Sequence, residues 1–189
     1  MKLDPKKTAV LTLDIQEGIM NFAPGAAATA IPNAAKVADA ARKGGFLLMH
    51  VGIGFEPGHP EISPDSLRFE MIKKLGGFTK GSDNAKTHRD VFRQGDIVLY
   101  KHRTSAFSGS PLETILRAQG IKTLVLMGIA TSGIVLSTLR QASDMDFQCV
   151  VIKDACFDSD EEVHRVLMEK VFARQATVVT AQAFVSDFV

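Results

Sequence analysis

The sequence has few residues of the types that build disulfide scaffolds, zinc fingers or base-stacking surfaces. Its 189 residues include two cysteines, one tyrosine and no tryptophan. Two cysteines cannot form a disulfide framework or, alone, a zinc finger. A scarcity of aromatic side chains leaves few platforms for single-stranded nucleic acid. These absences exclude a small disulfide-rich fold and disfavour a nucleic-acid-binding function.

An excess of charge of one sign and a long apolar run are also missing. Lys and Arg number 22 against 21 Asp and Glu, a formal net charge of +1, so we expect neither phosphate neutralisation nor a polybasic membrane contact. No apolar run approaches the roughly 18 residues needed to cross a bilayer, and the first residues lack the apolar segment of a secretory signal. We therefore expect a cytoplasmic protein with reduced thiols and no membrane or nucleic-acid partner.

Short apolar runs alternate with helical patterns along the whole chain. Hydrophobic residues make up 46% of the sequence, enough for a sizeable core. The alternation favours an α/β fold, a three-layer α/β/α sandwich with a six-stranded, largely parallel sheet in one domain over residues 1–189. The expected strands are residues 8–13, 46–51, 97–100, 122–127, 148–152 and 177–180. The expected helices are residues 33–42, 66–75, 111–119, about 134–145, and 159–173, the last with Ser159 and Glu162 as a capping box.

Two polar residues and a turn stand where three of these strands end. Ligands of open parallel sheets bind beyond the carboxyl ends of the strands. Asp14 closes the first strand, Lys101 closes the third, and a turn at residues 128–133 follows the fourth. An acid and an amine at one sheet edge can tune each other's charge. From position alone, a turn-capping Asp14 and a solvated Lys101 are an equal alternative. The long loop at residues 52–96 is expected to cover the site.

Three segments of the sequence resemble the signature segments of the isochorismatase-like cysteine hydrolase family. They occur in the family's order, and the resemblance extends over essentially the whole chain. It implies a Rossmann-like α/β/α sandwich, a small-molecule substrate, no redox cofactor and a homodimer or homotetramer. The segments are LTLDIQ (Leu11–Gln16), YKHRTSAF (Tyr100–Phe107) and GIATSGIVLSTLRQASD (Gly128–Asp144).

The resemblance also implies roles for single residues. Asp14 is similar to the family's acid/base and Lys101 to its charge-tuning lysine. The peptide between Ile129 and Ala130 matches a cis peptide beside the active site, which helps to aim backbone N–H groups at an oxyanion. The same turn includes Thr131 and Gly133. Residues expected on the substrate side are Gln16, Phe22, Arg103 and Phe107; for Arg103, an ion pair with a neighbouring helix is an equal alternative.

One position departs from the family pattern. Where the family carries its nucleophilic cysteine, this sequence has Ile134. Isoleucine has no nucleophilic group, so a thioester mechanism through this position is impossible. Ordinary amidase activity is therefore not expected, despite the resemblance.

Three functions stay open. The first is hydrolysis without a cysteine, with Asp14 as acid/base tuned by Lys101, acting for example on a vinyl ether of the isochorismate type. The second is a catalytically silent protein that binds a small molecule or a partner on the same fold. The third is an amide hydrolase that uses Cys156, which lies just after the fifth strand. Cys149 begins that strand and is expected at its opposite end.

A metal site is not expected. Zinc-dependent relatives suggested by the resemblance use an Asp with two His after the second strand. In this sequence His50 lies within the expected strand and His59 in the following loop, with no Asp between them. The two side chains would meet only by chance of folding, so we expect no metal.

Overall fold

The computed structural model describes residues 2–188 and contains a six-stranded sheet in the order β3-β2-β1-β4-β5-β6. Every neighbouring pair of strands is parallel, and the order reverses between β1 and β4. This confirms the expected α/β fold. The strands are β1 (Thr8–Leu13), β2 (Leu47–Ile53), β3 (Ile97–Lys101), β4 (Thr123–Gly128), β5 (Gln148–Ile152) and β6 (Thr177–Val179).

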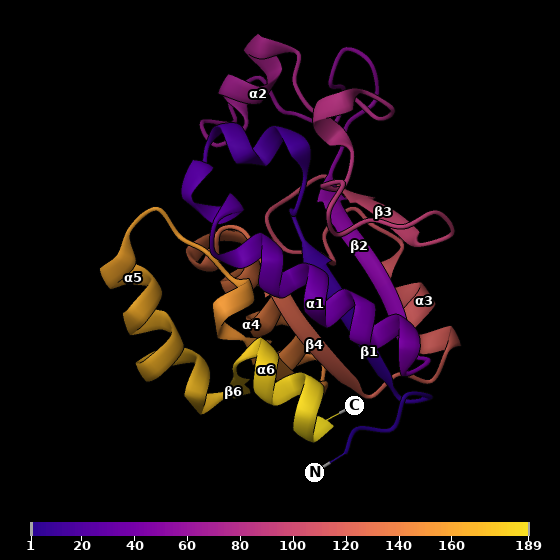
Figure 1. Ribbon diagram of the computed structural model, residues 1–189. Helices are drawn as coiled ribbons and strands as arrows, with labels where there is room; N and C mark the ends of the chain where they lie inside the picture. The colour runs from indigo at the N-terminus through magenta and orange to yellow at the C-terminus, as the bar shows by residue number, and fades with distance from the viewer. Residues whose placement is uncertain (1, 189) are drawn as a thin grey trace.

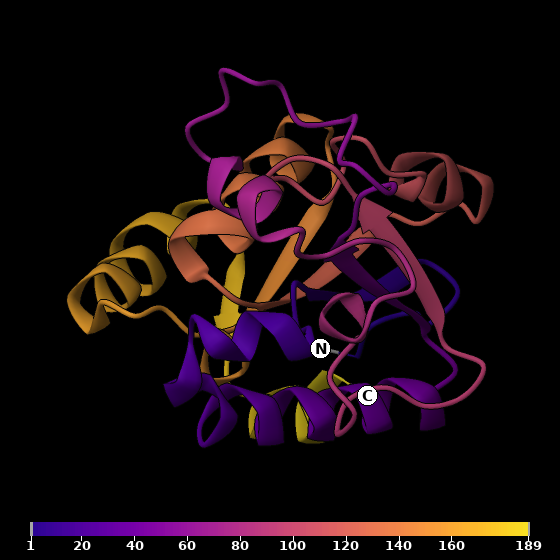
Figure 2. The ribbon, with the colours of Figure 1, turned by 90° about the horizontal axis from the view of Figure 1, so that it is seen from above.

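Helices cover both faces of the sheet (Figures 1 and 2). One face carries α1 and α6, and the other carries α3 and α4. With helices on both sides, β1 and β4 are buried along their whole length, which explains why they are continuous apolar runs. The helices are α1 (Ala30–Lys43), α2 (Glu70–Leu75), α3 (Leu112–Ala118), α4 (Leu136–Asp144), α5 (Glu161–Val166) and α6 (Ala181–Ala183).

Several expected boundaries are corrected. The helix expected at residues 66–75 is only α2, because the chain before it turns twice. The helix expected at residues 159–173 begins at Glu161 and continues beyond α5 as irregular helical turns to Arg174. Its N-cap is Asp160, whose carboxylate accepts hydrogen bonds from the N–H groups of Glu162 and Val163. The predicted capping box from Ser159 was therefore wrong by one residue.

The connection between β2 and β3, residues 54–96, rises above the carboxyl edge of the sheet (Figure 1). We call it the β2–β3 connection. It includes α2 and has its own small core, separate from the main one, formed with the end of β2. The buried members of this core are Ile53, Phe55, Ile62, Phe69 and Phe78. The connection is therefore a folded wall beside the strand ends and not an extended linker.

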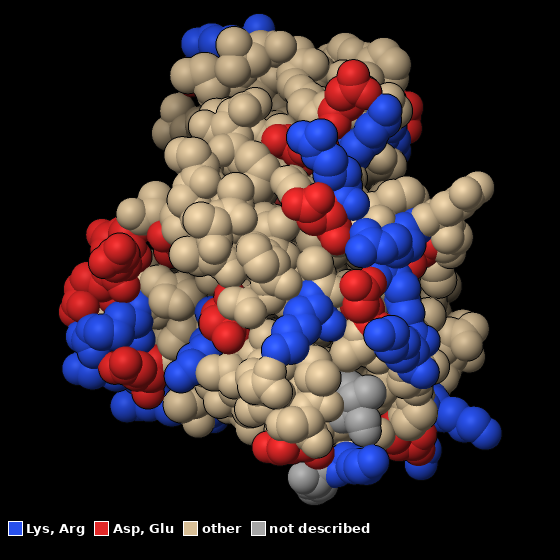
Figure 3. Space-filling view, viewed as in Figure 1, with Lys and Arg blue, Asp and Glu red and all other residues tan. Residues whose placement is uncertain are grey.

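The surface has mixed charge on the face seen in Figure 3. Lys and Arg side chains alternate there with Asp and Glu, and no single sign dominates. This pattern agrees with the near-zero net charge of the sequence. Among residues 2–188, no helix is both long enough and apolar enough to cross a bilayer.

Candidate active site

The carboxyl ends of β1, β3 and β4 converge at one edge of the sheet, beside the reversal of strand order. Asp14 directly follows β1, Lys101 is the last residue of β3, and Gly128 is the last residue of β4. A crevice forms at such a reversal because the chains leaving the two neighbouring strands turn to opposite faces. The sheet topology thus brings three distant parts of the sequence to one place.

Asp14 and Lys101 form a buried ion pair. Lys101 Nζ lies 3.0 Å from Asp14 Oδ2 and also donates a hydrogen bond of 2.8 Å to the carbonyl oxygen of Arg103. Lys101 is 2% exposed and Asp14 is 8% exposed. The other carboxylate oxygen, Oδ1, is buried and has no hydrogen-bond partner among the described residues. One oxygen of Asp14 is therefore held in place and the other is available.

The environment of Asp14 makes its carboxylate easier to protonate than an ordinary one. Burial raises the pKa of the Asp14 carboxyl, and the positive charge and hydrogen bond of Lys101 oppose this rise without cancelling it. Arg68, on the β2–β3 connection, lowers the same pKa to a smaller extent. A carboxyl group with a raised pKa can give a proton to a substrate and then take one back.

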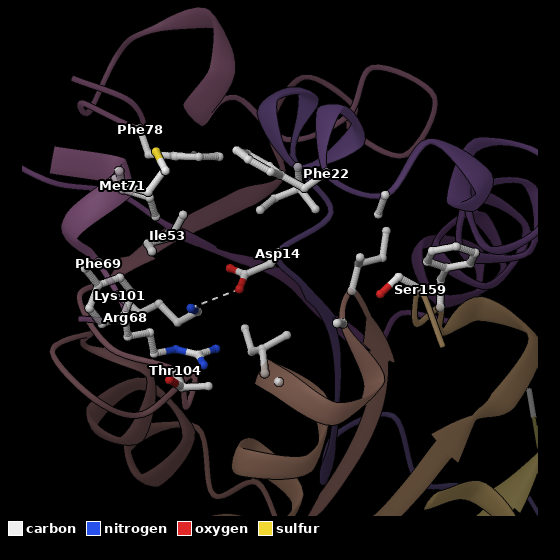
Figure 4. A pocket seen from close by; sticks show the side chains of 18 residues that line it. Asp14, Phe22, Ile53, Arg68, Phe69, Met71, Phe78, Lys101, Thr104 and Ser159 are labelled. Atoms are coloured by element: carbon white, nitrogen blue, oxygen red, sulfur yellow. Dashed lines mark ion pairs between the residues drawn. The ribbon is translucent and has the colours of Figure 1, made fainter. Parts of the chain in front are cut away.

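A cavity of about 410 Å³ opens above this pair (Figure 4). Its size is within the range of small-molecule sites. Both the sheet edge and the β2–β3 connection contribute walls, and most of the lining side chains are apolar. The lining residues are Asp14, Ile19, Phe22, Ala23, Ile53, Arg68, Phe69, Met71, Ile72, Phe78, Lys101, Thr104, Ile129, Ala130, Gly133, Ile134, Phe157 and Ser159.

The turn after β4 forms part of the cavity wall. The peptide between Ile129 and Ala130 is cis, at the place where the resemblance predicted one. Gly128 has a φ of 157°, and a Cβ at this position would lie 2.1 Å from the carbonyl oxygen of Leu13. Because no side chain fits there, β1 and β4 can end side by side and present the turn to Asp14.

Hydrogen bonds from the next segment hold this turn. Thr131 is fully buried and does not line the cavity. Its N–H donates to the carbonyl oxygen of Phe157, and its hydroxyl lies 2.8 Å from Nδ1 of His164. The N–H of Ser132 donates to Asp158 over 2.7 Å. The sequence placed Thr131 in the turn correctly but gave no sign that His164 and Asp158 support it.

Gln16 was predicted on the substrate side, and this is corrected. Its side chain does not line the cavity. Gln16 Nε2 donates to the carbonyl oxygens of Ile53, at 2.9 Å, and Ala85, at 2.7 Å, while Oε1 accepts from the N–H of Ile53 at 2.9 Å. The bond to Ala85 ties the β2–β3 connection to the chain after β1, and the two bonds with Ile53 tie that chain to the end of β2. Gln16 is a structural link, with no polar atom left for a substrate.

Arg103 and Phe107 also lie away from the cavity, and their predicted role is corrected. Arg103 Nη1 donates to the carbonyl oxygens of Glu61 and His102, so the side chain turns toward the outer surface. Phe107 is buried and stacks against Phe147, with ring centroids 6.2 Å apart. By contrast, Phe22 does line the cavity, at its exposed mouth.

The sequence missed Arg68, which supplies the second positive charge of the cavity. Figure 4 shows its side chain reaching past Lys101, with the guanidinium group turned into the cavity near Thr104. Arg68 lies in an irregular stretch just before α2. No periodicity or motif marks such a position, and only the folded connection brings it to the sheet edge.

Neither cysteine lines the cavity. Cys149 lies inside β5, and burial raises the pKa of its thiol to about 12. Cys156 lines a separate surface depression with Asn33 and His164. Burial raises the pKa of the Cys156 thiol to about 12 as well. A thiol in this state is not a nucleophile near neutral pH.

The two histidines weighed as metal ligands have other contacts. His50 lies 2.6 Å from the Thr12 hydroxyl and 3.0 Å from an oxygen of Asp96. His59 Nε2 lies 2.8 Å from the carbonyl oxygen of Gly77. Residues 2–188 contain no group of three or more His, Cys, Asp or Glu side chains placed to hold a metal ion.

Comparisons with known proteins agree with one another. The isochorismatase domain model matches residues 8–183. An uncharacterised isochorismatase family protein of Bacillus subtilis, YwoC, is 30% identical over 99% of this chain and 97% of its own length. The maleamate amidohydrolase of Pseudomonas putida is 28% identical over 94% of this chain and 84% of its own length.

Solved structures show the same architecture. A cysteine hydrolase from Pseudomonas syringae superposes with a TM-score of 0.86 at 16% identity, covering 98% of this chain and 93% of its own. The N-carbamoylsarcosine amidase of Thermoplasma acidophilum superposes with a TM-score of 0.76 at 27% identity, covering 93% of this chain and 96% of its own. The first of these likenesses establishes the fold, and the second adds sequence similarity to it.

Proposed function

The chain belongs to the isochorismatase family, and from this premise we propose that it hydrolyses a small metabolite without a cysteine nucleophile. Asp14 is the acid and base of the reaction, and Lys101 tunes it. The observation that carries this proposal is the state of Asp14: buried, paired through one oxygen and unbonded through the other at the floor of a cavity.

The absence of a thiol from the cavity lining supports the proposal. Ile134 lines the cavity, and the resemblance of the third segment assigns the family's cysteine to this position. The hydroxyl groups of Thr104 and Ser159 also line it, but neither forms a hydrogen bond with Asp14 or Lys101 in the described chain. A nucleophile needs an adjacent base for activation. Water activated by Asp14 is therefore the attacking group.

A vinyl ether of the isochorismate type suits this arrangement. Protonated Asp14 gives its proton to the terminal carbon of the double bond, and the ether oxygen stabilises the resulting oxocarbenium ion. Water then adds to the cationic carbon, and the Asp14 carboxylate takes the released proton. The hemiketal breaks into a ketone and an alcohol. Lys101 stabilises the carboxylate between the two proton transfers.

Amide hydrolysis through Cys156 is the competing function. The names of two relatives, maleamate amidohydrolase and N-carbamoylsarcosine amidase, describe amide substrates. In this chain, however, Cys156 lies outside the cavity and burial raises its thiol pKa to about 12. The state of this thiol therefore favours the cysteine-independent reaction.

The decisive experiment is a hydrolysis screen of the purified protein against isochorismate and a panel of small amides, including nicotinamide. Each reaction is run before and after alkylation of thiols. We expect isochorismate turnover that alkylation does not change and that Asp14→Asn reduces about 10²- to 10⁴-fold. Asp65→Asn, an exposed carboxylate outside the cavity, is the matched control and should be fully active.

Two other results of the screen would contradict the proposal. Amide turnover that disappears on alkylation would assign catalysis to a cysteine. Silence across the panel, with ligand-induced thermal shifts, would favour the binding protein. Ile134→Cys is a further variant for the screen, because it places a thiol in the cavity that Asp14, Ile129 and Ala130 also line. This variant should gain alkylation-sensitive amide turnover if Ile134 occupies the nucleophile position.

A further inference from the structure

A second, smaller cavity lies beside the one that contains Asp14. Its volume is about 140 Å³, and it is lined by residues of the short helix η1 (Glu17–Asn21), of α2 and of the turn that follows α2. Three residues, Phe22, Ile72 and Phe78, line both cavities. These three side chains therefore separate the two spaces, which we call the main cavity and the side cavity.

The backbone of Phe78 adopts a conformation that bulky residues rarely take. Its φ is 57°, in the left-handed region, which glycine, asparagine and aspartate enter far more readily. Phe78 directly follows Gly76 and Gly77, so an aromatic residue stands at a position of this turn where a third glycine would be less strained. Residues held in such conformations cluster at active sites and ligand-binding segments. The strain at Phe78 therefore points to a task for its ring.

Contacts on both sides of the backbone hold Phe78 in this conformation. Its N–H donates to Asn84 Oδ1 at 3.0 Å, and its carbonyl oxygen accepts from the N–H of Phe55 at 2.9 Å. Gly18 leaves room for the ring, because a Cβ there would lie 3.0 Å from Phe78 Cε1 and 2.7 Å from Asn84 Cβ. Phe78 is 3% exposed, whereas Phe22 is 60% exposed. Phe78 is therefore the fixed aromatic part of the wall between the cavities.

The ring of Phe78 stands at the end of the main cavity away from Asp14. Figure 4 shows the Phe22 and Phe78 side chains pointing toward each other, above Asp14 in that view. A ligand with its reacting group at Asp14 therefore meets Phe78 with its opposite end. The inference below rests on the proposed function only in placing one end of the ligand at Asp14.

We propose that Phe78 is a specificity-determining residue, whose ring closes the main cavity toward the side cavity. Only compact molecules are then buried whole. A chain at the end of the ligand opposite Asp14 cannot enter the side cavity and stays in solvent at the mouth. Glycine at position 78 would adopt the observed φ without strain and would open a passage between the two cavities. The length of ligand that the protein can bury is thus set by one side chain.

Calorimetric titration of the whole protein with benzamide and with 4-propylbenzamide tests the proposal. Both probes carry the same neutral amide, whose N–H groups suit the unpartnered Asp14 Oδ1, and they differ only in a chain at the opposite end. The wild type should bind the two with affinities within about threefold of each other, because the chain stays in solvent. Phe78→Gly should bind 4-propylbenzamide about tenfold more tightly than benzamide, since burial of the chain outweighs the entropy lost in ordering it.

Two further variants and a second measurement accompany the titration. Phe92→Gly is the matched control, because Phe92 is on the same connection and lines neither cavity; it should behave as the wild type. If Phe78→Gly does not fold, Phe78→Leu takes its place and should show about a threefold preference for the longer probe. In denaturant, Phe78→Gly should unfold at a higher concentration than Phe78→Ala, because only glycine adopts a positive φ freely.

Three results would overturn the proposal. The first is a wild type that already prefers 4-propylbenzamide about tenfold, and the second is a folded Phe78 variant with no such preference or no saturable binding of this probe up to about 1 mM. The third is a Phe78→Ala protein more stable than Phe78→Gly, which would remove the strain on which the assignment rests. Titration needs no turnover, so failure of the hydrolysis screen leaves this test intact. Conversely, Asp14-dependent hydrolysis without the gain in Phe78→Gly would retain the proposed function and reject the role of Phe78.

Discussion

The Asp14–Lys101 pair and Arg68 face the same cavity, but the chain holds them in different ways. The pair stands at the ends of hydrogen-bonded parallel strands and is almost completely buried. Arg68 stands on the β2–β3 connection, just before a helix of only six residues. Nearby on this connection Leu67 is 91% exposed and Leu75 is 68% exposed.

This difference separates two tasks. Groups that exchange protons must stay in fixed geometry, and strands packed on both faces provide it. Groups that select a ligand can sit on a segment with few buried contacts, where opening costs little free energy. Substitutions in the β2–β3 connection are therefore expected to alter which ligand binds, and substitutions at the sheet edge to alter whether anything reacts.

Lys101→Met gives the largest expected effect on stability, because it removes the charge partner of a buried carboxylate. Breaking a buried pair typically costs about 3–5 kcal/mol when the remaining charge is not neutralised. In the variant, burial raises the pKa of Asp14 and no Lys101 charge opposes it. A carboxyl whose folded pKa is raised is most favourable at low pH and loses stability as pH rises through that pKa. Denaturant unfolding should show a deficit that grows with pH.

Lys122→Met is the control for this comparison. Lys122 is exposed and its side chain has no ion pair or hydrogen bond with the described residues. Its replacement should change the free energy of unfolding by less than about 0.5 kcal/mol at every pH. A small, pH-independent loss of unfolding free energy in Lys101→Met would mean that the Asp14–Lys101 pair does not stabilise the sheet edge.

The sequence was sufficient to predict the sheet edge because its signals are local. Apolar runs mark the strands, and the polar residue that ends each run marks the carboxyl edge. That rule places Asp14 and Lys101 at the carboxyl edge of a parallel sheet, but it leaves a turn-capping Asp14 and a solvated Lys101 as an equal alternative; the family resemblance favoured the shared site. The observed 3.0 Å distance places them in one site, as expected, and not on solvated surface.

The β2–β3 connection was not predictable in the same way because its contacts are non-local. Gln16 bonds to Ile53 and Ala85, which are 37 and 69 residues away. Nothing in the sequence shows that these backbone groups would need a partner at that point. Arg68 likewise acquires its position only after the small core of the connection has formed. Family resemblance could not supply either fact, since neither follows from a motif.

Gln16→Leu is expected to have the next largest effect, because it loosens the link between the two regions. The change leaves the backbone groups of Ile53 and Ala85 buried without partners, at a cost of about 2–4 kcal/mol after partial relaxation. Hydrogen exchange should rise mainly within the β2–β3 connection. Gln94→Leu, at an exposed residue without side-chain bonds, should have no such effect. Uniformly faster exchange over the sheet would show that the two regions open together.

Asp96→Asn tests the other end of the connection and has the smallest expected effect. Asp96 accepts hydrogen bonds from Arg42 and from the N–H of Arg93, and lies 3.0 Å from His50. Burial alone would raise the pKa of Asp96, but the bonds from Arg42 and His50 hold it well below its usual range. A carboxyl with a lowered folded pKa stabilises the protein above its unfolded pKa and loses that contribution as pH falls.

The variant should therefore be less stable than the wild type by about 2 kcal/mol at pH 7, the usual worth of a hydrogen bond to a charged group. Arg42 keeps Asp39, at 2.6 Å, which limits the loss. The difference in stability between the variant and the wild type should narrow as pH falls below about 4, because the unfolded wild-type chain then binds a proton at Asp96 while the lowered pKa of the folded state resists protonation. Asp65→Asn, a change at an exposed residue, provides the baseline. If the difference in stability persists at acidic pH, the packing of the Asp96 side chain stabilises the connection and its charge does not.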